Sequence, residues 1–185
     1  IITEQDRNKN RRFGFRRSRN AGAAMFHDAY RNKRVLVTGH SGFKGTWLSF
    51  WLERLGADVL GVSLPPEETP SHFELLKPRV RSLELDVRCA SGVLSAMEEF
   101  RPEIVFHLAA QPLVRLGYRI PAETFATNVM GAVNVLEAVR VVRCARAVVV
   151  VTSDKCYAEW ERPPENGCRE SDPMGGGDPY SASKG

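Results

Sequence analysis

The sequence predicts an α/β fold built on a doubly wound parallel sheet, and three features of the chain support this prediction. From Arg34 onward, short runs rich in β-branched residues alternate with amphipathic stretches. The short runs are apolar on both faces, which is typical of parallel strands that helices cover on each side. A glycine-rich turn, Gly39 to Gly45, joins the first apolar run to the first amphipathic stretch. Together these features place a sheet of at least five strands between residues 34 and 152.

The expected elements follow one another at short intervals. The first strand and helix cover 34–38 and 43–55, and Gly56 ends the helix. A long helix begins at Pro121, where proline is favourable in the first turn. The other expected elements are strands at 58–63, 81–86, 103–108 and 147–152, a helix at 91–100 and a last helix near Tyr180. Residues 64–78 and the Pro- and Gly-rich segment 158–179 are expected to be loops, and a loop as long as the second is usually functional or mobile.

Length and composition fit an ordinary globular domain. The chain has 185 residues, of which 43% are hydrophobic and 26% are charged. Seven of its 26 basic residues but two of its 22 acidic ones fall in residues 1–24, which leaves 19 basic and 20 acidic residues in the rest. The folded part is therefore close to neutral, and we expect no nucleic-acid partner for it.

The N-terminal segment 1–33 is expected to be a basic, disordered extension. It has no apolar stretch of signal-peptide length, and its Arg-rich composition is compatible with a transit peptide. A start site at Met25, about ten residues before the first strand, would make the tail an artefact of the chosen start. We therefore interpret 1–33 as an inert extension and 34–185 as the folded domain.

Cysteine and apolar patterns exclude other classes of protein. The cysteines show no C-x-x-C spacing and no histidine at metal-ligand spacing, so we expect reduced thiols in a cytoplasmic protein and no metal. No run approaches the roughly 18 apolar residues of a membrane span. We therefore expect no membrane association.

The glycine-rich turn is the first candidate site. Its pattern is G-x-x-G-x-x-G, it follows a buried strand directly, and it opens a helix. Glycines let the backbone approach a pyrophosphate, which then lies on the exposed N–H groups of the helix N-terminus. The expected acid about 20 residues later is replaced by Ser63-Leu64-Pro65-Pro66, with Glu67 and Glu68 slightly further on. Because no Arg or Lys lies there to bind a 2′-phosphate, we expect NAD rather than NADP.

Two further groups of residues point to proton-transfer chemistry. Thr152-Ser153-Asp154-Lys155 ends the fifth predicted strand, and ligands of open parallel sheets bind beyond the carboxyl ends of the strands. A hydroxyl, an acid and an amine there can serve as hydrogen-bond donor, general acid and general base, although a polar turn would look the same. Tyr180 and Lys184 lie one helical turn apart, and a neighbouring ammonium favours the phenolate that removes a proton from a substrate hydroxyl.

These motifs together resemble the extended short-chain dehydrogenase/reductase family, whose members bind NAD on a Rossmann-type sheet. Within that family, the chain is similar to the CDP-glucose 4,6-dehydratases. His40 and Lys44 in the glycine turn and Lys155 after the acid support the subgroup, because dTDP-glucose dehydratases typically have Glu at the last position. The segments that carry the resemblance are residues 35–45, 107–115, 127–131, 152–157 and 178–185.

The resemblance implies a site, a substrate and a partner. The catalytic residues would be Ser153, Asp154, Lys155, Tyr180 and Lys184. Tyr180 and Lys184 would also bind NAD, together with Gly39, Ser41, Gly42, Phe43, Lys44, Gly45, Asp86, Val87, Leu108, Ala109, Ala110, Gln111 and Thr127. The substrate would be CDP-glucose, in deoxysugar biosynthesis. The full-length protein would be a homodimer in which two helices of each subunit pair, the long helix 121–142 and the helix that begins near Tyr180. The family's C-terminal half, which closes over the nucleotide sugar, would lie beyond Gly185.

Two other interpretations remain open. The chain could be a sugar-nucleotide epimerase or reductase of the same superfamily, although these enzymes usually lack the Asp154-Lys155 pair. It could also be a non-catalytic NAD-binding module, although an intact Tyr180 and Lys184 argue against that role.

Overall fold

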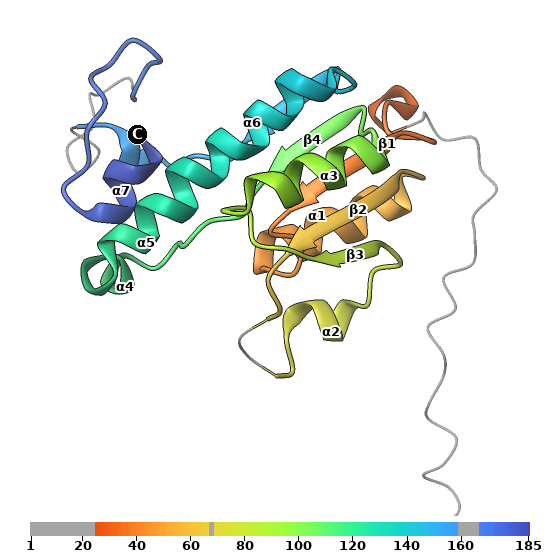
Figure 1. The fold of residues 1–185 in the computed structure, drawn as a ribbon, viewed down its shortest axis with the longest axis horizontal. Helices are drawn as coiled ribbons and strands as arrows, with labels where there is room; N and C mark the ends of the chain where they lie inside the picture. Colours follow the sequence, from red (N-terminus) through yellow and green to blue (C-terminus); the bar gives the residue numbers. More distant parts are fainter. Residues whose placement is uncertain (1–24, 67–68, 159–166) are drawn as a thin grey trace, which may run out of the picture.

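A parallel sheet forms the centre of the molecule (Figure 1). The structure is a computed structural model that describes residues 25–66, 69–158 and 167–185. Its five strands run in the order β3-β2-β1-β4-β5, and every neighbouring pair is parallel. Their bounds are β1 Arg34–Thr38, β2 Asp58–Ser63, β3 Arg81–Glu84, β4 Ile104–His107 and β5 Ala147–Val150. The predicted doubly wound α/β fold is therefore confirmed.

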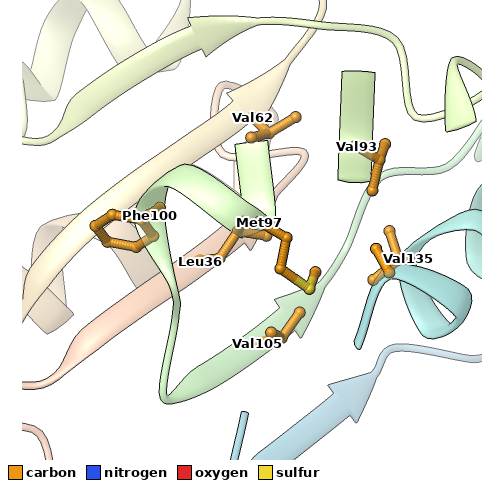
Figure 2. Close-up of a cluster of buried hydrophobic side chains, with 8 residues drawn as sticks. Leu36, Val62, Val93, Met97, Phe100, Val105 and Val135 are labelled. Carbon is orange, nitrogen blue, oxygen red and sulfur yellow. The ribbon is translucent and has the colours of Figure 1, made fainter. Parts of the chain in front are cut away.

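Helices cover both faces of this sheet and enclose two apolar clusters. On one face, α3 (Ala90–Phe100) and α6 (Gly131–Val142) pack against β1, β2 and β4. Figure 2 shows this cluster, in which Met97 and Val135 meet Val105, all three with no exposed surface. On the other face, α1 (Phe43–Arg54) packs Leu52 against the alternate residues of β1 and β2. The alternation of each strand between two apolar layers explains why its sequence is apolar throughout.

Two short helices were not predicted. α2 (His72–Leu76) lies within residues 64–78, which were expected to be a loop. Ser71 and Glu74 form a capping box, in which Glu74 N donates to Ser71 Oγ at 3.1 Å and Ser71 N donates to Glu74 Oε2 at 2.7 Å. The expectation of a plain loop was wrong because this S-x-x-E signature was overlooked. The second short helix, α4 (Val114–Arg119), follows β4.

The long helix begins at Pro121 as predicted but is not regular throughout. It consists of α5 (Pro121–Phe125), a π-helical segment η3 (Ala126–Met130) and α6. The whole stretch, Pro121–Val142, has a mean hydropathy of 1.3 in its most apolar window, which is sufficient in length and composition to cross a membrane. One such helix is weak evidence for a span, because core helices of soluble proteins pass the same test, and α6 packs against α3.

The polar segments gather beyond one end of the sheet. Figure 1 shows α4, α5 and α7 (Pro179–Lys184) together at this end. A short helical turn, η4 (Asp154–Cys156), follows β5 and contacts α7. Lys184 Nζ donates a hydrogen bond of 2.9 Å to the carbonyl of Val151, the residue directly after β5. The last helix therefore lies at the carboxyl edge of the sheet, where ligands of this architecture bind.

The described part of the chain begins before the first strand. Residues 25–33, which the sequence assigns to the extension, contain a short helical turn, η2 (Met25–Asp28). Tyr30 packs against the second apolar cluster, with its ring centroid 6.4 Å from that of Phe106. Residues 1–24, Glu67, Glu68 and residues 159–166 of the predicted long loop lie outside the described residues.

Candidate functional site

The glycine turn follows β1 and is closed by backbone contacts that exclude side chains. Gly39 has φ +71°, and its N–H donates to the carbonyl of Val62 at 2.7 Å. A Cβ on Gly39 would lie 2.7 Å from the nitrogen of Ala109, and one on Gly45 would lie 2.0 Å from the carbonyl oxygen of Gly39. Both approaches are too close for any larger residue. The sequence requires glycine at these positions because strand, turn and helix cross here.

The turn leaves donors available at the start of α1. Gly42 is the N-cap, is exposed and offers no side-chain cap, so the first N–H groups of this twelve-residue helix lack side-chain partners. Such groups, at the positive end of the helix, attract phosphate. Lys44 is also exposed, and its charge, after burial, contributes to the lowered pKa of Lys184. The free N–H groups at the start of α1 and the exposed Lys44 form a donor set that fits the pyrophosphate of a dinucleotide.

The side chain of His40 joins the glycine turn to the neighbouring strands. The His40 ring is 2% exposed, and its Nε2 lies 2.7 Å from Ser82 Oγ on β3. A Cβ on Gly61 would lie 2.2 Å from this ring, so the glycine in β2 makes room for the histidine. Burial lowers the pKa of His40, which favours a neutral ring. Sequence reasoning used His40 as a family marker and missed this structural role.

Ser41 and Phe43 connect the turn to β2 and to α2, respectively. Ser41 Oγ lies 2.8 Å from Ser63 Oγ, at the end of β2. The Phe43 ring is 71% exposed and stacks on His72 of α2, with ring centroids 4.9 Å apart. The unpredicted helix α2 therefore supports the first residue of α1.

The loop after β3 holds two residues expected to contact the cofactor. Asp86 accepts hydrogen bonds from the backbone N–H and the guanidinium of Arg88, which lower the pKa of Asp86 although burial opposes them. Val87 is 4% exposed and packs against Gly131, where an added Cβ would lie 2.8 Å from its side chain. Asn134 on α6 donates to the carbonyl of Val87 at 2.9 Å. This loop is thus held in place by its own ion pair and by α6.

A buried hydroxyl connects β1 to the segment that follows β4. Thr38 Oγ1 accepts hydrogen bonds of 3.2 Å from both Leu108 N and Ala109 N, and it lies 2.7 Å from His107 Nδ1. Since Thr38 accepts two N–H groups, its own proton points to Nδ1, and His107 is the neutral tautomer with its proton on Nε2. Burial and the nearby Lys184 charge lower the pKa of His107 to about 4. A neutral His107 therefore lies near Lys184.

Asn128, a residue that sequence reasoning did not select, holds the last helix in position. It is 5% exposed and lies in the π-helical segment beside the predicted Thr127, which is half-buried. Its Oδ1 accepts from Gln111 N at 2.8 Å, and its Nδ2 donates to the Gln111 carbonyl at 3.1 Å and to Ser183 Oγ at 2.8 Å. A π-helical turn often marks a functional position. The sequence signal for it was its place in residues 127–131, a segment that carries the family resemblance.

Gln111 continues this network with its side chain. Its Nε2 donates to Thr124 Oγ1 at 2.9 Å and to the Leu113 carbonyl at 3.2 Å, and its Oε1 accepts from Leu113 N at 2.6 Å. Leu108, Ala109 and Ala110, which precede it, are all half-buried. The whole predicted segment 108–111 is therefore ordered between β4 and α4.

The predicted catalytic residues lie on two neighbouring elements. Ser153 is the N-cap of η4, and its Oγ donates to Asp154 Oδ1 at 3.1 Å and accepts from Lys155 N at 3.3 Å. Tyr180 and Lys184 lie on α7, which contacts η4. The structure thus brings both groups to the same edge of the sheet. Contact between the Ser153 and Tyr180 hydroxyls remains a prediction.

Asp178 connects these two elements. It is the N-cap of α7 and accepts from Ser181 N at 3.0 Å. Burial would raise the pKa of Asp178, but the hydrogen bonds from Ser181 and the charge of Lys155 contribute to a net lowering. The Lys155 charge therefore acts on the N-terminal end of the helix that carries Tyr180.

Comparison with known proteins identifies the family. Residues 35–185 match the model of the NAD dependent epimerase/dehydratase family. The chain belongs to this family. It is 52% identical to a CDP-glucose 4,6-dehydratase of Salmonella typhimurium over 84% of the chain and 44% of that protein. It is 32% identical to a UDP-glucose 4-epimerase of Mycolicibacterium smegmatis over 82% of the chain and 48% of that protein.

Solved structures support the fold and the cofactor. A Thermus thermophilus UDP-glucose 4-epimerase in complex with NAD matches with a TM-score of 0.67 and 34% identity, over 82% of this chain and 47% of that one. An epimerase of Methanothermobacter thermautotrophicus matches with a TM-score of 0.72 and 25% identity, over 85% and 46% of the two chains. The cofactor is therefore NAD, as predicted. The chain spans about half the length of these relatives.

Proposed function

We propose that the protein is a nucleotide-sugar 4,6-dehydratase, a hydro-lyase that converts CDP-glucose to CDP-4-keto-6-deoxyglucose. The observation that carries this proposal is the 52% identity to the Salmonella dehydratase, compared with 32% to the Mycolicibacterium epimerase over a similar share of the chain. The arrangement of Asp154 and Lys155 directly after β5, beside the helix of Tyr180, supports it.

The first step is removal of a proton from the sugar 4-hydroxyl. Tyr180 is the base, and Ser153 shares the hydrogen bond to the same hydroxyl. Lys184 is held by the Val151 carbonyl and would bind the ribose next to the nicotinamide. Bound NAD would supply the redox chemistry, taking a hydride from carbon 4 and returning it to carbon 6.

The second step is loss of water from carbons 5 and 6. The 4-keto group acidifies the proton on carbon 5, and Lys155 removes it. Asp154 protonates the departing hydroxyl on carbon 6. Asp154 is exposed at the end of the sheet, and its Oδ1 already accepts the Ser153 hydroxyl. Ser153 and Asp154 therefore position one another before the substrate binds, and the Ser153 proton would turn from Asp154 to the sugar 4-hydroxyl in the first step.

Two substitutions in the full-length protein test these roles separately. Tyr180→Phe should block hydride transfer to the cofactor, whereas Lys155→Ala should permit it but stop elimination, so that enzyme-bound NADH accumulates. Single-turnover absorbance in the NADH band, with CDP-glucose added to the NAD-loaded protein, distinguishes the two. Normal turnover by Lys155→Ala would show that another group is the elimination base.

A second candidate is a sugar-nucleotide epimerase or reductase. The solved neighbours named above are epimerases, which favours this alternative at the level of the family. Analysis of the product decides between them. A dehydratase releases a 4-keto-6-deoxy sugar nucleotide and accumulates no NADH, whereas an epimerase releases a sugar nucleotide with the same mass as the substrate. A chain that binds NAD but acts on neither substrate would be a binding module.

We also propose that the full-length protein is a cytoplasmic homodimer. The long helix exposes an apolar stripe: Phe125, Val129, Val133 and Leu136 have between 37% and 46% of their surface exposed. Pairing this helix with its copy would bury the stripe. Sedimentation of the chain and of a Leu136→Glu variant tests this, and a monomeric wild-type chain that stays soluble without detergent would contradict it.

A further inference from the structure

The end of β2 has an unusual residue where dinucleotide-binding sheets commonly place an acid. Ser63 is the last residue of β2 and directly follows Val62, whose carbonyl accepts the N–H of Gly39. It therefore lies beside the glycine turn. In this architecture a carboxylate at this place usually binds the adenosine ribose.

A short chain of hydroxyl groups occupies the place instead. Ser41 Oγ donates to the Leu64 carbonyl at 3.2 Å and lies 2.8 Å from Ser63 Oγ. Since the proton of Ser41 is directed to Leu64, the proton of Ser63 is directed to Ser41. The lone pairs of Ser63 Oγ then remain able to accept a hydrogen bond from a ligand. Both serines are half-buried, so a ligand can reach them.

We propose that Ser41 and Ser63 form a neutral subsite for the adenosine ribose, in which Ser63 Oγ accepts a hydrogen bond from the 2′-hydroxyl. A carboxylate at this position would repel the 2′-phosphate of NADP, whereas a hydroxyl does not. The protein therefore discriminates between the two dinucleotides less strongly than a variant with a carboxylate at the same place.

A carboxylate on the neighbouring strand could take this role instead. Among the described residues, Glu84 on β3 is paired in register with Ser63, so both side chains project from the same face of the sheet. Its side chain is exposed at the edge of the sheet. The experiment must therefore distinguish a hydroxyl subsite from a carboxylate supplied by β3.

Calorimetric titration with NAD and, separately, with NADP tests the subsite without any sugar substrate. Ser63→Ala should weaken NAD binding about 3- to 10-fold, the usual effect of one hydrogen bond, and Ser63→Thr should restore it. Ser63→Asp should raise the ratio of the NADP to the NAD dissociation constant by about tenfold or more. Ser171→Asp, which adds the same charge at an exposed loop position, should leave this ratio unchanged.

Two results would overturn the proposal. One is a ratio that Ser63→Asp leaves unchanged in a protein that still binds NAD. The other is loss of NAD affinity on Glu84→Gln, or on combined Glu67→Gln and Glu68→Gln, with Ser63→Ala binding normally, because the ribose would then be held by a carboxylate. The inference rests on NAD as the cofactor of the proposed reaction but not on the sugar chemistry. A protein that fails to dehydrate CDP-glucose yet shows the expected ratios would refute the function alone.

Discussion

At the glycine turn, backbone contacts and burial fix Gly39, His40 and Gly45, whereas after β5 the Ser153 side chain bonds to its own neighbours in sequence. Gly39 and Gly45 are enclosed by backbone atoms, and His40 spans from the turn to β3. Ser153, in contrast, bonds to Asp154 and Lys155, and β5 lies at the edge of the sheet with Val149 44% exposed. The difference indicates that the glycine turn is preorganised, while the predicted catalytic groups depend on a few long-range contacts through α7.

The largest expected effect tests the rigidity of the glycine turn. Gly45→Ala would place a methyl group 2.0 Å from the Gly39 carbonyl oxygen, so turn and helix must separate. We expect a loss of about 3 kcal/mol or more in the free energy of unfolding and no measurable NAD binding. Urea unfolding and calorimetry measure the two quantities.

A matched glycine near the catalytic edge is the control for this substitution. A Cβ on Gly177 has no heavy atom within 4 Å. Gly177→Ala should change the free energy of unfolding by less than about 0.5 kcal/mol and leave NAD affinity intact. Equal losses from both substitutions would remove the contrast between the two regions.

The next prediction uses two asparagines of the long helix. Asn128→Ala removes three hydrogen bonds at a buried position and leaves Gln111 N without its acceptor. We expect the free energy of unfolding to fall by about 2–3 kcal/mol and the backbone amides of α7 to exchange hydrogen faster. Asn134→Ala removes donors to Val87 and Arg88, so it should cost about 1 kcal/mol and loosen the loop after β3 instead. If amide hydrogen exchange increased in the same segments for both variants, the glycine-turn region and the region after β5 would not be independent.

Much of the fold could be predicted because it depends on local patterns. Alternating apolar runs located all five strands, and the glycine spacing located the first strand–turn–helix unit. The ends of β3 and β5 were each predicted two residues too long, because Leu85 N and Val151 N donate the last hydrogen bonds to the neighbouring strands, to the carbonyls of Ser63 and His107, and the pairing stops there. Helix α2 was missed although its capping box stands in the sequence.

The candidate site was less predictable because its supporting contacts join distant residues. Asn128 and Ser183 are 55 residues apart, and His40 and Ser82 are 42 apart. The pattern of residues in a single sequence does not indicate which distant residues will be in contact. Gly61 shows the same limit: a glycine inside a strand suggests a close approach, but nothing local identifies the His40 ring as the group that approaches.

The last expected effect depends on pH and concerns His107, which bonds to Thr38 and lies near Lys184. Its pKa is about 4 in the folded protein, below the ordinary value of 6.5. Between these values the unfolded chain binds more protons than the folded one, so stability is full above pH 6.5 and falls as the pH drops toward 4. From pH 7.5 to 5.5 the loss should be about 1.4 kcal/mol.

The comparison of His107→Asn with the wild type isolates this contribution. Asparagine can accept the Thr38 hydroxyl proton but does not titrate, so the variant should lose about 1.4 kcal/mol less between the two pH values. The lowered pKa of His40 contributes to both proteins and cancels. The carboxylates of Asp86 and Asp178, whose pKa values are also lowered, lose their contributions only below about pH 5. Parallel pH profiles for the two proteins in urea unfolding would mean that His107 is solvated or charged, and that burial beside Lys184 does not hold it neutral.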